Sequence, residues 1–134
     1  MNDAVAFAYA LGDATRWRIA MLIADKTLCV CELADGLQIP QSTLSSHLAT
    51  MRGAGMVEVT KCDKWAYYRL ARSVAPLFES MKKHFAGSLS KDAVLKADKK
   101  RTAARVAIRG QTDCKGPRRA IPPKEHAPAK ALCC

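Results

Sequence analysis

A pair of cysteines separated by a single residue, Cys29 and Cys31, is the part of this sequence best suited to chemistry. Thiolates are preferred ligands of soft metal ions, and the positive end of a helix lowers the pKa of a thiol that lies there. In a regular helix, side chains two residues apart point about 200° away from each other, so both sulfurs can hold one ion only if one cysteine lies outside the helix. Buried, unreactive thiols are the alternative, and the spacing alone leaves both open.

Four further cysteines could add a third soft ligand: Cys62, Cys114, Cys133 and Cys134. Cys62 is interpreted as an incidental exposed thiol, whereas the adjacent pair at the chain end suits a soft-metal trap or is an incidental ending.

Asp3 stands where an export signal would be basic, and the apolar run over residues 4–11 is too short to cross a bilayer. We therefore expect a cytoplasmic protein with no membrane partner, whose cysteines do not form structural disulfides.

Small and hydrogen-bonding side chains gather on one face of a helix predicted from about residue 40 to residue 54. Its apolar stripe, Leu44, Leu48 and Met51, repeats at helical spacing and should face inward. The opposite face suits a DNA major groove, because glutamine can pair with adenine and hydroxyls can donate to phosphates or base edges. Basic side chains nearby would neutralise phosphates. The predicted DNA-binding residues are Gln41, Ser42, Thr43, Ser45, Ser46, His47 (between the two faces), Arg52, Lys61 and Lys64.

Basic charge is concentrated toward the C-terminus. The 134 residues carry 22 Lys/Arg and 12 Asp/Glu, a net charge of +10. Residues 1–87 hold 10 basic and 8 acidic residues (+2), and residues 88–134 hold 12 and 4 (+8). This asymmetry indicates an acidic polymer as partner, although a merely solvated surface is the alternative. Four of the six prolines lie beyond residue 116. We therefore expect a domain over residues 1–87 and a basic tail over 88–134, helical through about 88–107 and disordered from about 110.

Local patterns in the first 87 residues predict a mainly α fold with one β-hairpin. Apolar residues recur at helical spacing in four segments, and capping residues and breakers separate them. An alternating segment and an aromatic segment around a polar turn are typical of a hairpin with a basic tip. The predicted helices lie near residues 3–11, 13–24, 30–37, 40–54 and 74–85, and the hairpin joins residues 57–60 to residues 65–70. This order is that of a winged helix-turn-helix.

Motifs for enzymatic chemistry are not found. The chain has three histidines, no G-x-S-x-G motif, no glycine-rich phosphate loop and no paired-carboxylate constellation. The last helix of the predicted domain offers Glu79 and His84 without the spacing of a zinc site, and we expect His84 to be solvated. We predict that the protein is not an enzyme and has no catalytic cofactor.

Four separated motifs resemble, in order, the ArsR/SmtB family of winged-helix metalloregulatory repressors. They are LGDATR at 11–16, LCVCELA at 28–34, QSTLSSHL at 41–48 and KWAYYRL at 64–70. The similarity covers about residues 5–75, and the second motif is similar to the arsenic-responsive branch. The resemblance implies a homodimer paired through its first and last helices. It also implies a repressor that leaves double-stranded operator DNA when a metal or metalloid binds.

One departure concerns the ligands: Ala34 stands where older arsenic-responsive members carry a third cysteine. We interpret Cys29 and Cys31 as the essential pair for trivalent arsenic or antimony, with a tail cysteine or a small thiol as an optional third ligand. Binding should distort the third helix, which positions the recognition helix. Two alternatives remain: a winged-helix repressor that senses oxidants or reactive sulfur through the same cysteines, and a constitutive DNA-architectural protein.

Overall fold

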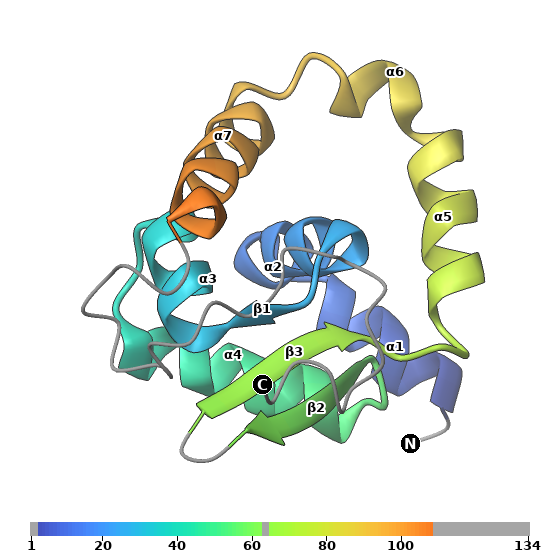
Figure 1. The fold of residues 1–134 in the computed structure, drawn as a ribbon. Helices are drawn as coiled ribbons and strands as arrows, with labels where there is room; N and C mark the ends of the chain where they lie inside the picture. Colours follow the sequence, from blue (N-terminus) through green and yellow to red (C-terminus); the bar gives the residue numbers. More distant parts are fainter. Residues whose placement is uncertain (1–2, 63–64, 109–134) are drawn as a thin grey trace.

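The computed structural model describes residues 3–62 and 65–108 (Figure 1). The helices are α1 (Asp3–Leu11), α2 (Ala14–Asp25), α3 (Val30–Leu37), α4 (Gln41–Gly53), α5 (Ala75–His84), α6 (Ala86–Leu89) and α7 (Ala93–Ala107). The strands are β1 (Leu28–Cys29), β2 (Val57–Cys62) and β3 (Trp65–Leu70). The predicted order of five helices and a hairpin over the first 87 residues is confirmed. Strand β1 was not predicted, because two residues are too short to show an alternating pattern.

Capping residues position α2, α3 and α4 relative to one another. Asp13 is the N-cap of α2, where its carboxylate accepts a hydrogen bond from the backbone N–H of Arg16 at 3.0 Å. This hydrogen bond lowers the pKa of Asp13. Helix α3 ends at Leu37, and its C-cap Gln38 adopts the left-handed conformation (φ 56°), which lets the chain turn sharply. Pro40 is then the N-cap of α4, so only residues 38–40 separate the two helices.

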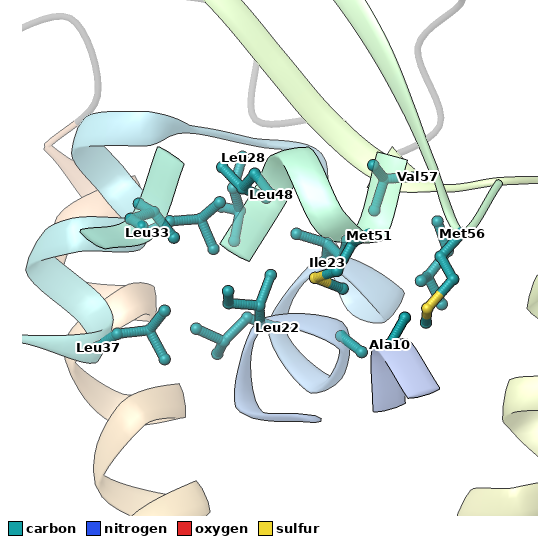
Figure 2. Close-up of a cluster of buried hydrophobic side chains, with 14 of the residues drawn as sticks. Ala10, Leu22, Ile23, Leu28, Leu33, Leu37, Leu48, Met51, Met56 and Val57 are labelled. Carbon is teal, nitrogen blue, oxygen red and sulfur yellow. The ribbon is translucent and has the colours of Figure 1, made fainter. Parts of the chain in front are cut away.

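The hydrophobic core lies between α2, α3, α4 and the sheet (Figure 2). The predicted inward stripe of α4 is confirmed, because Leu44, Leu48 and Met51 are all buried. Figure 2 shows Leu33 and Leu37 of α3 on the same cluster, so α3 is held from its inner side by apolar packing. Buried core residues include Ala10, Ile19, Leu22, Ile23, Leu28, Met56, Val57, Leu70 and Phe78.

The sheet is antiparallel, with strand order β1-β3-β2. Strands β2 and β3 pair from Val57 with Leu70 to Cys62 with Trp65, and they form the predicted hairpin, hereafter the wing. On the other edge of β3, Cys29 pairs with Tyr67. The strand that leads into α3 is therefore joined by backbone hydrogen bonds to the wing.

After the wing, the chain forms an arch over α2 (Figure 1). Helix α5 stands on one side, α6 lies at the top, and α7 returns on the other side beside α3. The helix expected through residues 88–107 is thus interrupted, and α7 begins after its own N-cap, Asp92, whose carboxylate accepts a hydrogen bond from the N–H of Leu95 at 3.0 Å. Only part of the expected helix forms one element, because Asp92 offers the backbone a cap.

Helix α7 is anchored to α2 and α3 by charged side chains. The buried carboxylate of Asp98 accepts hydrogen bonds from Arg18 Nε at 2.7 Å and from Arg101 Nη2 at 2.8 Å. Arg105 Nε also lies 2.9 Å from Asp35 Oδ2. The sequence did not predict this packing on α3.

The segment expected to be disordered, from about residue 110, lies outside the described residues. Within residues 3–62 and 65–108, no helix combines the length and apolar character needed to span a membrane.

Candidate thiol site and nucleic-acid interface

The two cysteines of the predicted site lie where β1 becomes α3. Cys29 is the last residue of β1 and the N-cap of α3, with extended backbone (φ −86°, ψ 168°), so it stands outside the helix. Cys31 is within the first turn and half-buried. Both cysteines pack in one small cluster with Tyr67 and Trp65 of β3. The strand-to-helix transition thus avoids the opposed directions of a regular helix, and both sulfurs belong to one cluster.

The thiol of Cys29 is not activated. Burial is the largest cause that raises its pKa, and together with the nearby carboxylate of Glu32 it brings the pKa to about 11. Glu32 is itself buried, and its Oε1 accepts a hydrogen bond from the N–H of Cys29 at 3.0 Å. The expectation that the helix N-terminus would lower this pKa is therefore wrong, because burial and a like charge outweigh the helix dipole.

Glu32 was missed by the sequence analysis. It is the third residue of α3 and forms a capping box with Cys29. The spacing Cys29-x-x-Glu32 matches the usual Ser/Thr-x-x-Glu pattern with a thiol in place of the hydroxyl, and this was the available clue.

Cys31 reaches the next helix. Its Sγ lies 3.5 Å from the Nε2 of Gln41, the first residue of α4, which donates a weak hydrogen bond to the sulfur. Cys31 is disulfide-bonded in this structure, contrary to expectation, whereas Cys29 is a free thiol. Together the cysteines touch both neighbours of α3: Cys29 pairs with the wing, and Cys31 contacts α4.

A third ligand for this pair is not supplied by the part of the chain that the structure describes. In that part, no three His, Cys, Asp or Glu side chains gather closely enough to hold a metal ion. Ala34, at the position noted above, is buried. Cys62 ends β2, and the predicted tail ligands Cys114, Cys133 and Cys134 lie outside the described residues.

Most of the predicted DNA-binding side chains of α4 are exposed. The exposed side chains among them, hereafter the reading face, are Gln41, Ser42, Thr43, Ser45, Ser46 and Arg52. The apolar residues between them point into the core, which is the alternation that an amphipathic helix requires. Lys61 is exposed on β2, whereas Lys64 lies outside the described residues.

His47 is oriented differently from the reading face. It is half-buried, and its Nδ1 lies 3.4 Å from Arg16 Nη1 and 3.9 Å from Asp13 Oδ1. Arg16, which the sequence analysis did not single out as a site residue, also donates from Nε to the carbonyl of Ala10 at 2.6 Å and from Nη2 to that of Tyr9 at 3.2 Å. Its guanidinium therefore links the end of α1 to α4, and these contacts place His47 against the body of the protein.

These features define a class of protein. Two helices joined by a tight turn, the second with an exposed polar face, are followed by an antiparallel hairpin, and this is a winged helix-turn-helix. Residues 13–59 match the family model described as "Bacterial regulatory protein, arsR family". The chain belongs to this family, whose members are DNA-binding transcriptional regulators and not enzymes.

Similar proteins carry regulatory names. The chain is 42% identical over 74 residues to an arsenic resistance transcriptional regulator of Pseudomonas putida. The matched stretch covers 54% of this chain and 58% of that protein. It is 40% identical over 62 residues to the arsenical resistance operon repressor of Escherichia coli, covering 46% of this chain and 53% of that one. The chain thus spans little more than half the length of these two relatives. Among solved structures, HlyU of Vibrio cholerae matches with a TM-score of 0.58 and 30% identity, covering 63% of this chain and 92% of that chain.

Proposed function

We propose that this protein is a transcriptional repressor that binds operator DNA as a homodimer through α4 and the wing, and that it is released when trivalent arsenic or antimony binds Cys29 and Cys31. The observation that carries the proposal is the position of the two cysteines. They flank the start of α3, and each contacts a different DNA-facing element: Cys31 meets Gln41 of α4, and Cys29 pairs with Tyr67 of β3.

Release follows from the geometry that an arsenic centre imposes. Arsenite condenses with two thiols, so that two As–S bonds form and two water molecules leave. The arsenic centre would hold the two sulfurs at a fixed separation. Without arsenic, the position of Cys29 is set by the pairing of β1 and that of Cys31 by the first turn of α3. Any adjustment moves the Gln41 end of α4, the end that enters a major groove. A small change at the thiols is thereby converted into loss of DNA contacts.

DNA binding is supported by the reading face and by the charge of the chain. The N-terminal end of α4 presents an amide and hydroxyls, which can hydrogen-bond to base edges and phosphates. A net charge of +10 favours association with a polyanion through counterion release.

Dimerisation is supported by apolar side chains that the single chain leaves exposed. Val5 and Tyr9 on α1 are 49% and 64% exposed, and Leu77 and Phe85 at α5 are 50% and 46% exposed. Exposed large apolar residues on two helices favour an interface with a second copy, and a two-fold dimer would match a palindromic operator.

The test is release of the reduced protein from its own upstream DNA, titrated with arsenite, antimonite, cadmium, zinc and peroxide. We expect release by arsenite and antimonite, with apo DNA binding retained and arsenite response lost in Cys29→Ala and in Cys31→Ala. Cys62→Ala is the matched control and should respond normally. An arsenite response that survives in the Cys29→Ala/Cys31→Ala double variant contradicts the proposed inducer site.

A second candidate function, sensing of oxidants or reactive sulfur through the same cysteines, is favoured by one observation: Cys31 is disulfide-bonded in this structure. Intact mass separates the two candidates. If peroxide or persulfide shifts the mass of the reduced protein and releases DNA at concentrations where arsenite does neither, the redox function is correct. Arsenite-dependent mass and release support the metalloid function.

A further inference from the structure

A hollow of about 340 Å³ lies beneath the arch, between α2, α5, α6 and α7, and it is not part of the thiol site or of the reading face. Its volume falls within the range of small-ligand pockets, at about 300–1,000 Å³. Four helices line it. Two of them, α6 and α7, lie after residues 13–59, the part of the chain that matches the family model.

The inner surface of the hollow is mainly apolar. Met21 and Leu22 of α2 line one side, and Leu89 of α6 and Leu95 of α7 line the others. Leu22 and Leu95 are buried. Met21 and Leu89 are half-buried, so the side chains of these two residues remain available to a ligand. A surface of this kind favours a short hydrocarbon or an aromatic ring over a fully polar molecule.

The charged groups around the hollow have a positive excess. Its lining includes four basic residues, Arg18, Lys82, Lys96 and Lys99, and two acidic ones, Asp25 and Asp98. The Asp25 carboxylate lies 3.6 Å from Lys82 Nζ, which also contacts Glu79 Oε1 at 3.2 Å, and 3.4 Å from Lys99 Nζ. Each pocket carboxylate is thus compensated by two cations, since Asp98 is bound by Arg18 and Arg101.

Lys96 is the basic residue of the lining that does not pair with either of these carboxylates. Among residues 3–62 and 65–108 it forms no ion pair, and its side chain is exposed at the edge of the hollow. An anion at this position would gain a partner, whereas a cation would face the positive excess. We propose that the hollow binds a small amphipathic anion, with its acidic head at Lys96 and its apolar body against Met21, Leu89 and Leu95.

The site is placed to affect the DNA-binding end of the molecule. Asp98 lines the hollow and also anchors α7, and its partner Arg18 donates from Nη2 to the carbonyl of Leu37, the last residue of α3, at 3.0 Å. A ligand that fills the hollow adds contacts between α2 and α7, and it therefore stabilises the packing of α7 on α3.

The experiment follows the ¹³C-labelled methyl group of Met21 by NMR in the full-length reduced protein. Hexanoate is the test ligand, hexylamine has the opposite charge, hexanol has none, and acetate lacks the apolar body. We expect a saturable shift with hexanoate, weaker effects with hexanol and acetate, and no saturable shift with hexylamine. Lys96→Glu should weaken hexanoate binding at least about tenfold, because it replaces an attraction by a repulsion at an exposed position.

Lys100→Glu is the matched control: it makes the same charge change on an exposed residue of α7 that does not line the hollow, and it should bind hexanoate nearly as the unmodified protein does. Three results overturn the proposal: no saturable shift with hexanoate, equal binding of hexylamine, or equal effects of the two variants. A Met21 shift that depends on protein concentration without any ligand also overturns it, because a second copy then fills the hollow.

Discussion

The ionisation of Cys29 illustrates how strongly its surroundings control a single side chain. Cys29 is 6% exposed and lies beside the buried carboxylate of Glu32, so its thiolate is disfavoured and the pKa of the thiol is raised. Thiolates are the forms that attack and bind metals, and Cys29 is protonated at physiological pH, so it must lose its proton to bind a metal. Cys31 is half-buried, so the residue is more exposed than Cys29.

This ionisation predicts how stability depends on pH. The pKa of Cys29 is about 11 in the folded protein against an ordinary value of 9.0. Because the folded pKa is the higher one, the contribution is fully present below pH 9 and is lost as the pH rises toward 11. Across this window we expect unfolding free energy to fall by up to about 2–3 kcal/mol from this group.

The measurement is urea unfolding of the reduced protein at several pH values from 7 to 11. Cys29→Ala keeps the other titrating groups and removes this thiol, so the difference between the two curves isolates its contribution. Parallel curves for the two proteins across the alkaline range would show that Cys29 has an ordinary pKa.

A second prediction at this scale concerns the hydroxyls of the reading face. Ser42→Glu, Ser45→Glu and Ser46→Glu together place negative charge where phosphates and bases would lie, so we expect operator affinity to fall at least about tenfold. Ala103→Glu, on the exposed surface of α7, is the control and should bind normally. Fluorescence anisotropy with labelled operator DNA measures both, and normal binding by a folded triple variant rules out this face.

At the scale of the elements, the docking of α7 against α3 is the feature with the most specific packing. Gly36 of α3 faces Thr102 of α7, and a Cβ added at Gly36 would overlap the Thr102 hydroxyl. The Nε of Arg101 also donates to the carbonyl of Gly36 at 2.9 Å. Helix α3 is therefore held by the core on one side and by α7 on the other.

Gly36→Ala tests this docking. In an exposed helix the change would stabilise the protein by about 1 kcal/mol, but here we expect a loss of about 1–3 kcal/mol, because the new methyl group overlaps α7. Adding Thr102→Ala to Gly36→Ala should recover part of the loss by removing the hydroxyl. Urea unfolding of the single and double variants measures both effects.

Gly87→Ala is the matched control for that substitution. Nothing lies within 4 Å of a Cβ at Gly87, so it should be neutral or slightly stabilising. A stabilising Gly36→Ala would mean that α7 does not pack on α3 as described.

For the whole molecule, the distribution of charge matters more than any single contact. Residues 109–134 hold 6 basic and 2 acidic residues, a net charge of +4, whereas the basic residues of α7 partly serve its docking. A truncation that tests the charged tail must therefore end after Ile108 and retain α7.

We expect removal of residues 109–134 to weaken DNA binding and to make its salt dependence shallower, with the slope reduced by up to about 5 if all six basic residues contact phosphate. Preference for the operator over unrelated DNA should be retained, because the reading face is intact. Anisotropy titrations at several salt concentrations, with both DNAs, give slope and preference. Loss of preference with an unchanged slope would contradict this role.

The sequence by itself determined the order of helices and hairpin and the division of α4 into two faces. These follow from local rules. The spacing of Leu44, Leu48 and Met51 sets the apolar stripe of α4, and Asp13 caps α2 through a backbone N–H only three residues away. The cysteine pair at the start of α3 was also predicted, since its place depends on neighbouring residues only.

Only the tertiary structure decided how acidic Cys29 is and where α7 lies. The pKa of Cys29 depends on its burial, and Tyr67 of a distant strand contributes to that burial. The position of α7 depends on Asp98, whose carboxylate meets Arg18 from a helix near the start of the chain. Periodicity and caps act over a few residues, whereas burial and ion pairing join segments far apart in sequence, and no local pattern specifies which segments will meet.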